Sequence, residues 1–229
     1  MSVKENLKIV LEEIEKSKRN RKVAVDENVT LVAVTKNHGV DVMREAIDGG
    51  ILDIGENRVQ EAAEKFKSLE RDGVRKHLIG HLQTNKAKQA VKLFDLIHSV
   101  DSENLAEVIN KAASSTAKVQ NILIQVNLAD EVAKFGVSFE NLQQLIEKVD
   151  TLKNLRLRGL MLIAPNYADV ENCRPLFRSM RKIFDEIKST RQNFDILSMG
   201  MTHDYKIAVE EGANVVRVGT AIFGERIYT

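Results

Sequence analysis

The chain has 229 residues, of which 43% are hydrophobic and 29% charged, and its formal net charge is +1. This is the composition of an ordinary globular domain, and so small a net charge gives no overall attraction to nucleic acid or to a membrane surface. Cys173 is the only cysteine, which excludes an internal disulfide and suits a reducing compartment.

Residues 1–22 are predicted to form a leading helix, because their apolar residues recur at helical spacing with charges between them. The segment lacks the apolar core of a signal peptide, and no apolar run in the sequence approaches the ~18 residues of a membrane span. Its basic end has no neighbouring aromatic residues for stacking on bases. We therefore expect a cytoplasmic protein with neither membrane nor nucleic acid as a partner.

The rest of the chain alternates between short apolar runs and helix-like segments. The apolar runs fall near residues 30–36, 52–57, 77–80, 96–100, 121–127, 156–164, 195–200 and 214–219. The helix-like segments between them are 40–49, 58–70, 84–92, 102–114, 138–150, 172–188 and 203–211. Strands that alternate with helices indicate a parallel sheet, and eight such units favour a (β/α)8 TIM barrel over an open doubly wound sheet. No Pro/Gly/Ser-rich linker divides the chain, so we expect a single domain over 1–229.

Lys36 ends the first apolar run, LVAVTK, at the end of the barrel where chemistry is expected. It has the same parity as Val32 and Val34, which predicts that it points inward. A lysine in a partly dry pocket loses its proton more readily and can form a Schiff base. The alternative is a lysine that extends to water from a strand end.

Arg217 lies within the last apolar run and shares a strand face with Val215 and Gly219. If Gly219 faces a ligand, Arg217 faces the barrel interior, where a guanidinium needs an anion or a strong acceptor. That partner is either a ligand or an internal carboxylate.

The loops after the last two strands often bind phosphate in barrels. Thr202 is a good N-cap type before the predicted helix at 203–211, and Gly219 and Thr220 supply a close backbone approach and a hydroxyl. Ordinary helix capping would use the same residues. Together with Lys36 and Arg217, these loops predict a phosphorylated aldehyde as ligand, with pyridoxal 5'-phosphate (PLP) as the candidate.

Several motifs resemble one family, in the same order along the chain. They are LVAVTK, IGENRVQE, HLIGHLQTNK, KFG, GLM and LSMGMTHDY…EEGANVVRVGTAIFGER. The sequence is thereby similar to the YggS/PROSC family of pyridoxal phosphate homeostasis proteins, whose barrel is that of the N-terminal domain of alanine racemases. Two departures stand out: Asn37-His38-Gly39 replaces a lysine-containing sequence after Lys36, and Lys76 replaces a tryptophan before His77.

The resemblance implies roles for individual residues. Lys36 would be the Schiff-base lysine and Arg217 would face the pyridine nitrogen. Further cofactor-binding roles follow for the phosphate (Thr202, Gly219, Thr220 and the backbone at Met201), for the support of Arg217 (Ser198) and for the mouth beside Lys36 (Asn57 and His81). The implied function is to carry or buffer PLP and maintain vitamin B6 homeostasis without substantial catalysis, with apo-forms of PLP enzymes as partners and a monomeric state.

The sequence leaves three other functions to be compared. A PLP-dependent amino-acid racemase or decarboxylase would need an acid or base on the opposite ring face, and Tyr167 and His203 are the candidates after strands six and seven. A metal enzyme is disfavoured because the histidines form no HExxH or Cys/His signature. A pure interaction protein has no identifiable partner surface in the sequence.

Overall fold

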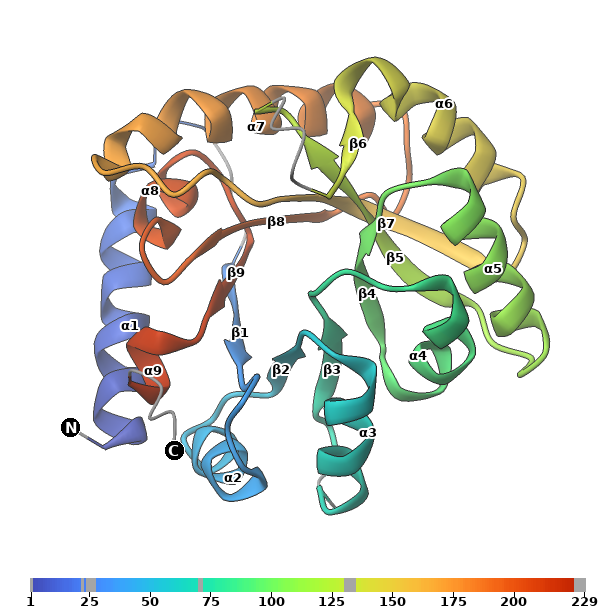
Figure 1. The fold of residues 1–229 in the computed structure, drawn as a ribbon. Helices are drawn as coiled ribbons and strands as arrows, with labels where there is room; N and C mark the ends of the chain where they lie inside the picture. Colours follow the sequence, from blue (N-terminus) through green and yellow to red (C-terminus); the bar gives the residue numbers. More distant parts are fainter. Residues whose placement is uncertain (1, 22, 24–27, 70–71, 130–134, 225–229) are drawn as a thin grey trace.

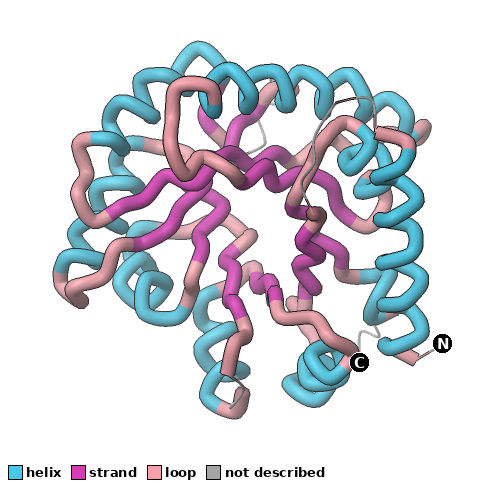
Figure 2. The backbone as a smooth tube through the Cα atoms, turned by 180° about the vertical axis from the view of Figure 1, so that it is seen from behind, coloured by secondary structure: helices cyan, strands magenta, loops and turns pink. Residues whose placement is uncertain are grey.

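The computed structural model describes residues 2–21, 23, 28–69, 72–129 and 135–224. Within these residues, parallel strands close into a ring with helices outside it (Figures 1 and 2). The strands of the ring are β1 (Thr30–Val34), β2 (Asp53–Glu56), β3 (Arg75–Leu78), β4 (Leu96–Val100), β5 (Gln120–Asn127), β7 (Leu155–Leu162), β8 (Ile196–Met201) and β9 (Val215–Val218). Each strand pairs with the next, and β9 closes the ring by pairing with β1. The fold is the predicted (β/α)8 barrel.

The helices follow the strands in alternation and cover the outside of the ring (Figure 2). They are α1 (Val3–Arg19), α2 (Val40–Asp48), α3 (Val59–Lys67), α4 (Ala87–Leu93), α5 (Glu103–Ser114), α6 (Phe139–Asp150), α7 (Arg174–Lys188), α8 (Tyr205–Glu210) and α9 (Thr220–Phe223), with 3-10 turns η1 (Thr84–Lys86) and η2 (Val170–Cys173). The sequence pattern predicted neither α9 nor β6 (Val137–Ser138), a short strand beside the end of β5. Both are too short to show a hydrophobic period.

The leading helix α1 confirms the predicted amphipathic segment. Ser2 caps it with a capping box that includes Glu5, and its buried face carries Leu7, Val10 and Ile14. That face packs on α8 and α9, so α1 lies along the part of the ring formed by the last strands (Figure 1). None of the helices that the structure describes combines the length and the apolar character needed to cross a membrane.

Side chains alternate between the two faces of each strand. Leu31 and Ala33 of β1 belong to the apolar core between strands and helices, so Val32 and Val34 face the inside of the barrel. The interior holds a small apolar cluster of Leu96, Leu123 and Met161. The interior also holds buried polar and charged residues, among them Asp53, His77, His98, Ser198 and Arg217.

Candidate functional site

Lys36 lies in a tight turn directly after β1. The amide of His38 donates to the carbonyl oxygen of Thr35 at 3.0 Å, and Asn37 adopts a left-handed φ of 63°. Asparagine tolerates that conformation better than most residues, which gives a local reason for Asn37 at this position. The turn leaves Lys36 half-buried at the carboxyl end of the strand.

The residue before Lys36 is fixed by a buried ionic group on the neighbouring strand. The carboxylate of Glu56, at the end of β2, accepts from Thr35 Oγ1 at 2.6 Å and from Lys65 Nζ at 2.8 Å. Lys65, on α3, also donates to the carbonyl oxygen of Thr35 at 2.7 Å. Burial raises the pKa of Glu56 against the lowering effect of these donors. Thr35 is thus tied through both its side chain and its backbone.

The residue after Lys36 is fixed by the same group. Glu61 Oε1 accepts from the amide of Asn37 at 2.5 Å and from Lys65 Nζ at 2.6 Å. Sequence reasoning missed this arrangement. The spacing of Glu61 and Lys65 indicates an i,i+4 pair on a helix face, but it gives no sign that the pair is turned inward against the Lys36 turn.

Arg217 lies inside the barrel, with 3% of the residue exposed. Its Nη1 donates to Ser198 Oγ at 2.6 Å and its Nη2 to the carbonyl oxygen of Leu162 at 2.9 Å. Both acceptors are neutral, and the nearby carboxylate of Asp204 only partly offsets the burial, which lowers the pKa of Arg217 to about 10. The guanidinium therefore stays charged at neutral pH, and it contacts Ser198, the residue that the family resemblance implied as its support.

The loops after β8 and β9 are bonded to each other. Thr202 Oγ1 accepts from the amide of Gly219 at 3.3 Å, and a Cβ at Gly219 would lie 3.2 Å from the carbonyl oxygen of Val34. This places the loop after β9 against the end of β1, two residues before Lys36. Thr220 is exposed and begins α9, in which the amides of Ile222 and Phe223 both donate to the carbonyl oxygen of Gly219.

One prediction about these loops is wrong in detail. Thr202 does not cap the following helix, because residues 202–204 form a turn and α8 begins at Tyr205 with Asp204 at the N-cap. The amide of Met201 donates to Asp204 Oδ1 at 2.5 Å. Met201 therefore offers its backbone N–H to a ligand only by exchanging that bond.

Asn57 and His81 follow β2 and β3. Asn57 lies two residues past Gly55, which pairs with Val34, and its buried Oδ1 has no hydrogen-bond partner within the described part of the chain. The ring of His81 stacks on Phe135 with a centroid distance of 3.8 Å, and its Nδ1 lies 3.7 Å from Asp101 Oδ2. An orphaned buried acceptor next to the Lys36 turn fits a ligand that brings a donor group.

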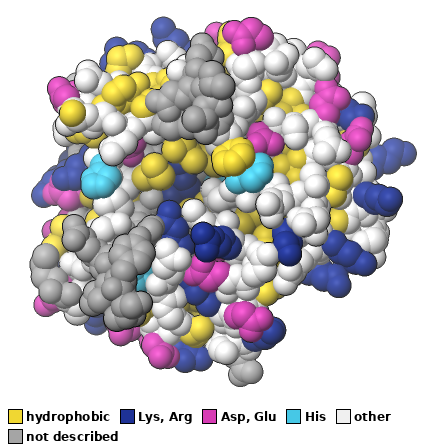
Figure 3. All heavy atoms as spheres, in the orientation of Figure 1, with side chains coloured by type: hydrophobic (Ala, Val, Ile, Leu, Met, Phe, Trp, Pro, Cys, Tyr) yellow, Lys and Arg dark blue, Asp and Glu magenta, His cyan; other side chains and the backbone are white. Residues whose placement is uncertain are grey.

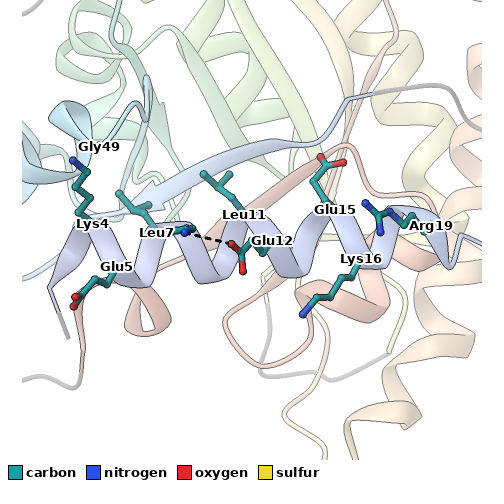
Figure 4. A pocket seen from close by; sticks show the side chains of 10 residues that line it. Lys4, Glu5, Leu7, Leu11, Glu12, Glu15, Lys16, Arg19 and Gly49 are labelled. Carbon is teal, nitrogen blue, oxygen red and sulfur yellow. Dashed lines mark ion pairs between the residues drawn. The ribbon is translucent and has the colours of Figure 1, made fainter.

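Other features of the molecule do not compete with this site. No group of three His, Cys, Asp or Glu side chains in the described ranges is arranged to hold a metal ion. A groove of about 720 Å³ runs along α1 and is lined mostly by charged side chains, among them the Lys8–Glu12 pair (Figure 4). It lies on the outer helix layer, not at the strand ends. On the face shown in Figure 3, Lys and Arg side chains gather near the centre, over the ring of strands.

Comparisons with known proteins agree on one family. The model of the alanine racemase N-terminal domain matches residues 9–227. The pyridoxal phosphate homeostasis protein of Aquifex aeolicus is 41% identical over 233 residues, with 100% of both chains covered, and that of Escherichia coli K12 is 37% identical over 206 residues, with 89% of this chain and 88% of the relative covered.

Solved structures give the same result. PipY of Synechococcus elongatus PCC7942, in the structure with PLP bound, superposes with a TM-score of 0.84 at 34% identity, covering 97% of this chain and 100% of the other. Alanine racemase of Clostridium difficile 630 shares the fold, with a TM-score of 0.71 at 17% identity over 98% of this chain and 57% of its own. The chain belongs to the family of pyridoxal phosphate homeostasis proteins, built on the barrel of the alanine racemase N-terminal domain.

Proposed function

We propose that this protein binds PLP as a Schiff base on Lys36 and carries or buffers the cofactor, without substantial catalysis of its own. The observation that carries the proposal is the fixed turn around Lys36, in which both neighbouring residues are tied to one buried ionic group. The relatives named above, and the PLP-bound PipY structure among them, support the choice of ligand.

The residues at the mouth suit a phosphorylated aldehyde. PLP supplies an electrophilic aldehyde on a pyridine ring that also bears a phosphate. The unprotonated Lys36 Nζ would attack the aldehyde carbon, and the carbonyl oxygen would leave as water, so that the reaction needs no other reactant. Thr202, Gly219 and Thr220 would hold the phosphate, and Asn57 and His81 would border the Lys36 side.

Arg217 supports carriage more than catalysis. Its guanidinium cannot accept a proton, so if it faces the ring nitrogen it disfavours the protonated ring and weakens the ring as an electron sink. Tyr167 and His203 are both exposed on loops, and among the described residues no recorded hydrogen bond orients either side chain as an acid or base.

The first experiment identifies the lysine. The purified protein is incubated with PLP, reduced with borohydride and digested, and the modified peptide is identified by mass spectrometry. We expect a single modified position at Lys36, none in Lys36→Ala, and an unchanged result in Lys67→Ala, which alters an exposed lysine on α3. A reduced adduct at one site in Lys36→Ala would overturn the assignment.

The second experiment tests carriage against catalysis. The loaded protein is incubated in heavy water with a panel of free amino acids, and loss of the α-proton signal is followed by NMR. No exchange from protein that visibly holds the Schiff base supports carriage. Exchange at enzyme-like rates that disappears in Lys36→Ala would instead make the protein a racemase-like catalyst.

Transfer is tested separately. Loaded protein is mixed with the apo-form of a PLP-dependent enzyme, and recovery of that enzyme's activity is compared with recovery from free PLP at the same concentration. Recovery from the loaded protein that persists when a scavenger removes free PLP supports direct transfer. Equal sensitivity to the scavenger would restrict the role to buffering.

A further inference from the structure

A line of buried hydrogen bonds crosses the inside of the barrel, from Arg217 to the opposite end. Ser198 Oγ, which accepts from Arg217 at 2.6 Å, lies 3.0 Å from His98 Nδ1. His98 Nε2 lies 3.0 Å from His77 Nδ1, and His77 Nε2 lies 2.9 Å from Asp53 Oδ1. We name these five residues the interior relay. Each is buried, with between 0 and 5% of its surface exposed.

Hydrogen bonds can be donated along the interior relay in only one direction that gives every polar group in it a partner. A guanidinium only donates, so Ser198 Oγ is an acceptor from Arg217, and its single hydrogen is then free to point at His98 Nδ1. His98 consequently carries its hydrogen on Nε2 and donates to His77 Nδ1. His77 in turn donates from Nε2 to Asp53. Every hydrogen is assigned by its neighbour, and Asp53 is the anion at which the series ends.

Donation in the reverse direction, from His98 to Ser198, has a higher free energy. If His98 donated to Ser198, then His77 would have to donate from both nitrogens, to His98 and to Asp53, and would be a cation. The Ser198 hydroxyl would then receive two donors and lose the acceptor for its own hydrogen, which is expensive in a buried site. A change at Asp53 that favours the reverse direction therefore alters the group that holds Arg217.

The charges around the interior relay favour the first direction. Burial, with the neighbouring His77 and Arg217, holds the pKa of His98 well below 6.5, so its ring is neutral. Burial works against ionisation of Asp53, but the hydrogen bonds from His77 and Arg75 prevail and lower its pKa. Arg75 is exposed and pairs with Asp53 from the rim. The carboxylate of Asp204 is the negative charge that acts on Arg217.

The outer end of the interior relay meets a polar cavity of about 450 Å³ at the amino end of the barrel, opposite the Lys36 end. Asp53, Arg75 and His77 line it, and so does a second ion pair, Arg158–Asp195, with a closest contact of 2.7 Å. In the part of the chain that the structure describes, Asp195 makes no recorded hydrogen bond to the interior relay. Asp53 and Asp195 therefore both line the cavity at the amino end of the barrel, but only Asp53 is connected to Arg217 by hydrogen bonds of the described residues.

We propose that Asp53, His77 and His98 are positioning residues, which act through Ser198 to fix the hydrogen bonds of Arg217. Through Arg217 they would set the pH at which the Schiff base of the bound cofactor loses its proton, although they lie toward the opposite end of the barrel. This rests on the proposed function for the part that concerns the cofactor. The inference about the direction of the interior relay stands on the protein alone.

The direction is tested on the protein without cofactor. Imidazole ¹⁵N shifts are measured for His77 and His98 in the wild type, Asp53→Asn and Asp195→Asn. We expect both rings to be neutral and protonated on Nε2 in the wild type and in Asp195→Asn. In Asp53→Asn the shifts of His98 move, although His98 does not touch residue 53. Unchanged His98 shifts, or an Nδ1-protonated His98 in the wild type, would overturn the proposal.

The effect on the cofactor is tested on the loaded protein. The pH midpoint of the absorption band of the Schiff base is compared among variants. Removal of the negative charge in Asp53→Asn should lower the midpoint, and removal of the cation in Arg75→Gln should raise it, so the exposed Arg75 variant serves if Asp53→Asn folds poorly. Asp195→Asn should leave the midpoint unchanged.

Ser198→Ala separates a relay from action through space. In that background Asp53→Asn should no longer shift the midpoint, because the link to Arg217 is cut. A shift that persists in the Ser198→Ala background, or an equal shift in Asp195→Asn, would overturn the proposal. Failure of the wild type to form any Schiff base would contradict the proposed function, while the ¹⁵N result would still decide the direction of the interior relay.

Discussion

Lys65 and Glu56 form an ion pair of 2.8 Å beneath the turn that carries Lys36, with 10% and 0% of their side chains exposed. The pair is part of a larger buried group, because the Lys65 ammonium also donates to the carbonyl oxygen of Thr35 and to the carboxylate of Glu61. It couples α3 to the ends of β1 and β2. The position of Lys36 therefore depends on how α3 packs against the ends of these two strands.

Lys65→Met should destabilise the protein by about 3–5 kcal/mol, because it leaves the Glu56 carboxylate buried without its cation. Lys67→Met on the same helix is the matched control, since its pair with Glu64 is exposed, and it should change the free energy of unfolding by less than about 0.5 kcal/mol. Urea unfolding at pH 7 measures both. Equal effects of the two substitutions would mean that the buried pair does not hold the turn.

Arg217→Glu should raise the pH at which the absorption spectrum of the PLP-loaded protein changes. A carboxylate favours a protonated ring nitrogen, whereas a guanidinium disfavours it. Because the introduced carboxylate would face the carbonyl oxygen of Leu162, Arg217→Gln provides a neutral variant that is easier to accommodate, and its midpoint should fall between the other two. An identical spectrum in all three proteins would place Arg217 away from the ring.

The barrel was predictable from the sequence because its signal is repeated. Each strand is a short apolar run, and each following helix shows its own apolar face, so an error in one element leaves the count of units intact. The inward direction of Arg217 could also be predicted, since strand parity places residues on one face, whereas its contact with Ser198 was implied only by the family resemblance.

The contacts that fix the turn at Lys36 could not be predicted from the sequence. Lys65 reaches Thr35 across 30 positions of sequence, and that contact depends on how α3 packs on the ring. The line from His98 to Ser198 spans 100 positions and crosses the barrel from one side to the other. Parity marks His77 and His98 as inward, but only the closed ring brings them together.

The neutral state of His98 predicts an acid-dependent loss of stability. Burial holds its pKa well below the 6.5 of an ordinary histidine. As the pH falls through 6.5, the unfolded chain takes up a proton that the folded chain refuses, so the free energy of unfolding decreases by about 1.4 kcal/mol for each pH unit from this residue. His98→Gln should remove that part of the slope below pH 6.5.

The control for this slope is His203→Gln, because His203 is exposed. It should leave the pH dependence of the wild type unchanged. Stability is measured by urea unfolding at half-unit intervals of pH, and the difference in slope between variant and wild type is the quantity compared. A wild-type slope that His98→Gln does not reduce would mean that His98 is charged in the folded protein.

Gly80→Ala tests the mouth on the side of Asn57. A Cβ at position 80 would lie 2.3 Å from the carbonyl oxygen of Asn57 and 2.8 Å from its Cα, so the backbone after β2 must move. Overpacking of this kind costs about 1–3 kcal/mol. If Asn57 holds the cofactor as proposed, the shift should also weaken PLP binding. A loss of about 1.4 kcal/mol of binding free energy would make the affinity about tenfold weaker.

Gly39→Ala is the matched control for Gly80→Ala. It is the N-cap of α2 in the loop after Lys36, where a Cβ would meet nothing within 4 Å, so the substitution causes no clash and should cost about 0.5–1 kcal/mol through the weaker capping by alanine. Unfolding gives the stability of both variants, and titration followed by the Schiff-base absorption gives their affinity for PLP. If Gly80→Ala loses stability but binds PLP as tightly as Gly39→Ala does, then Asn57 is a structural residue of the barrel rim and has no part in holding the cofactor.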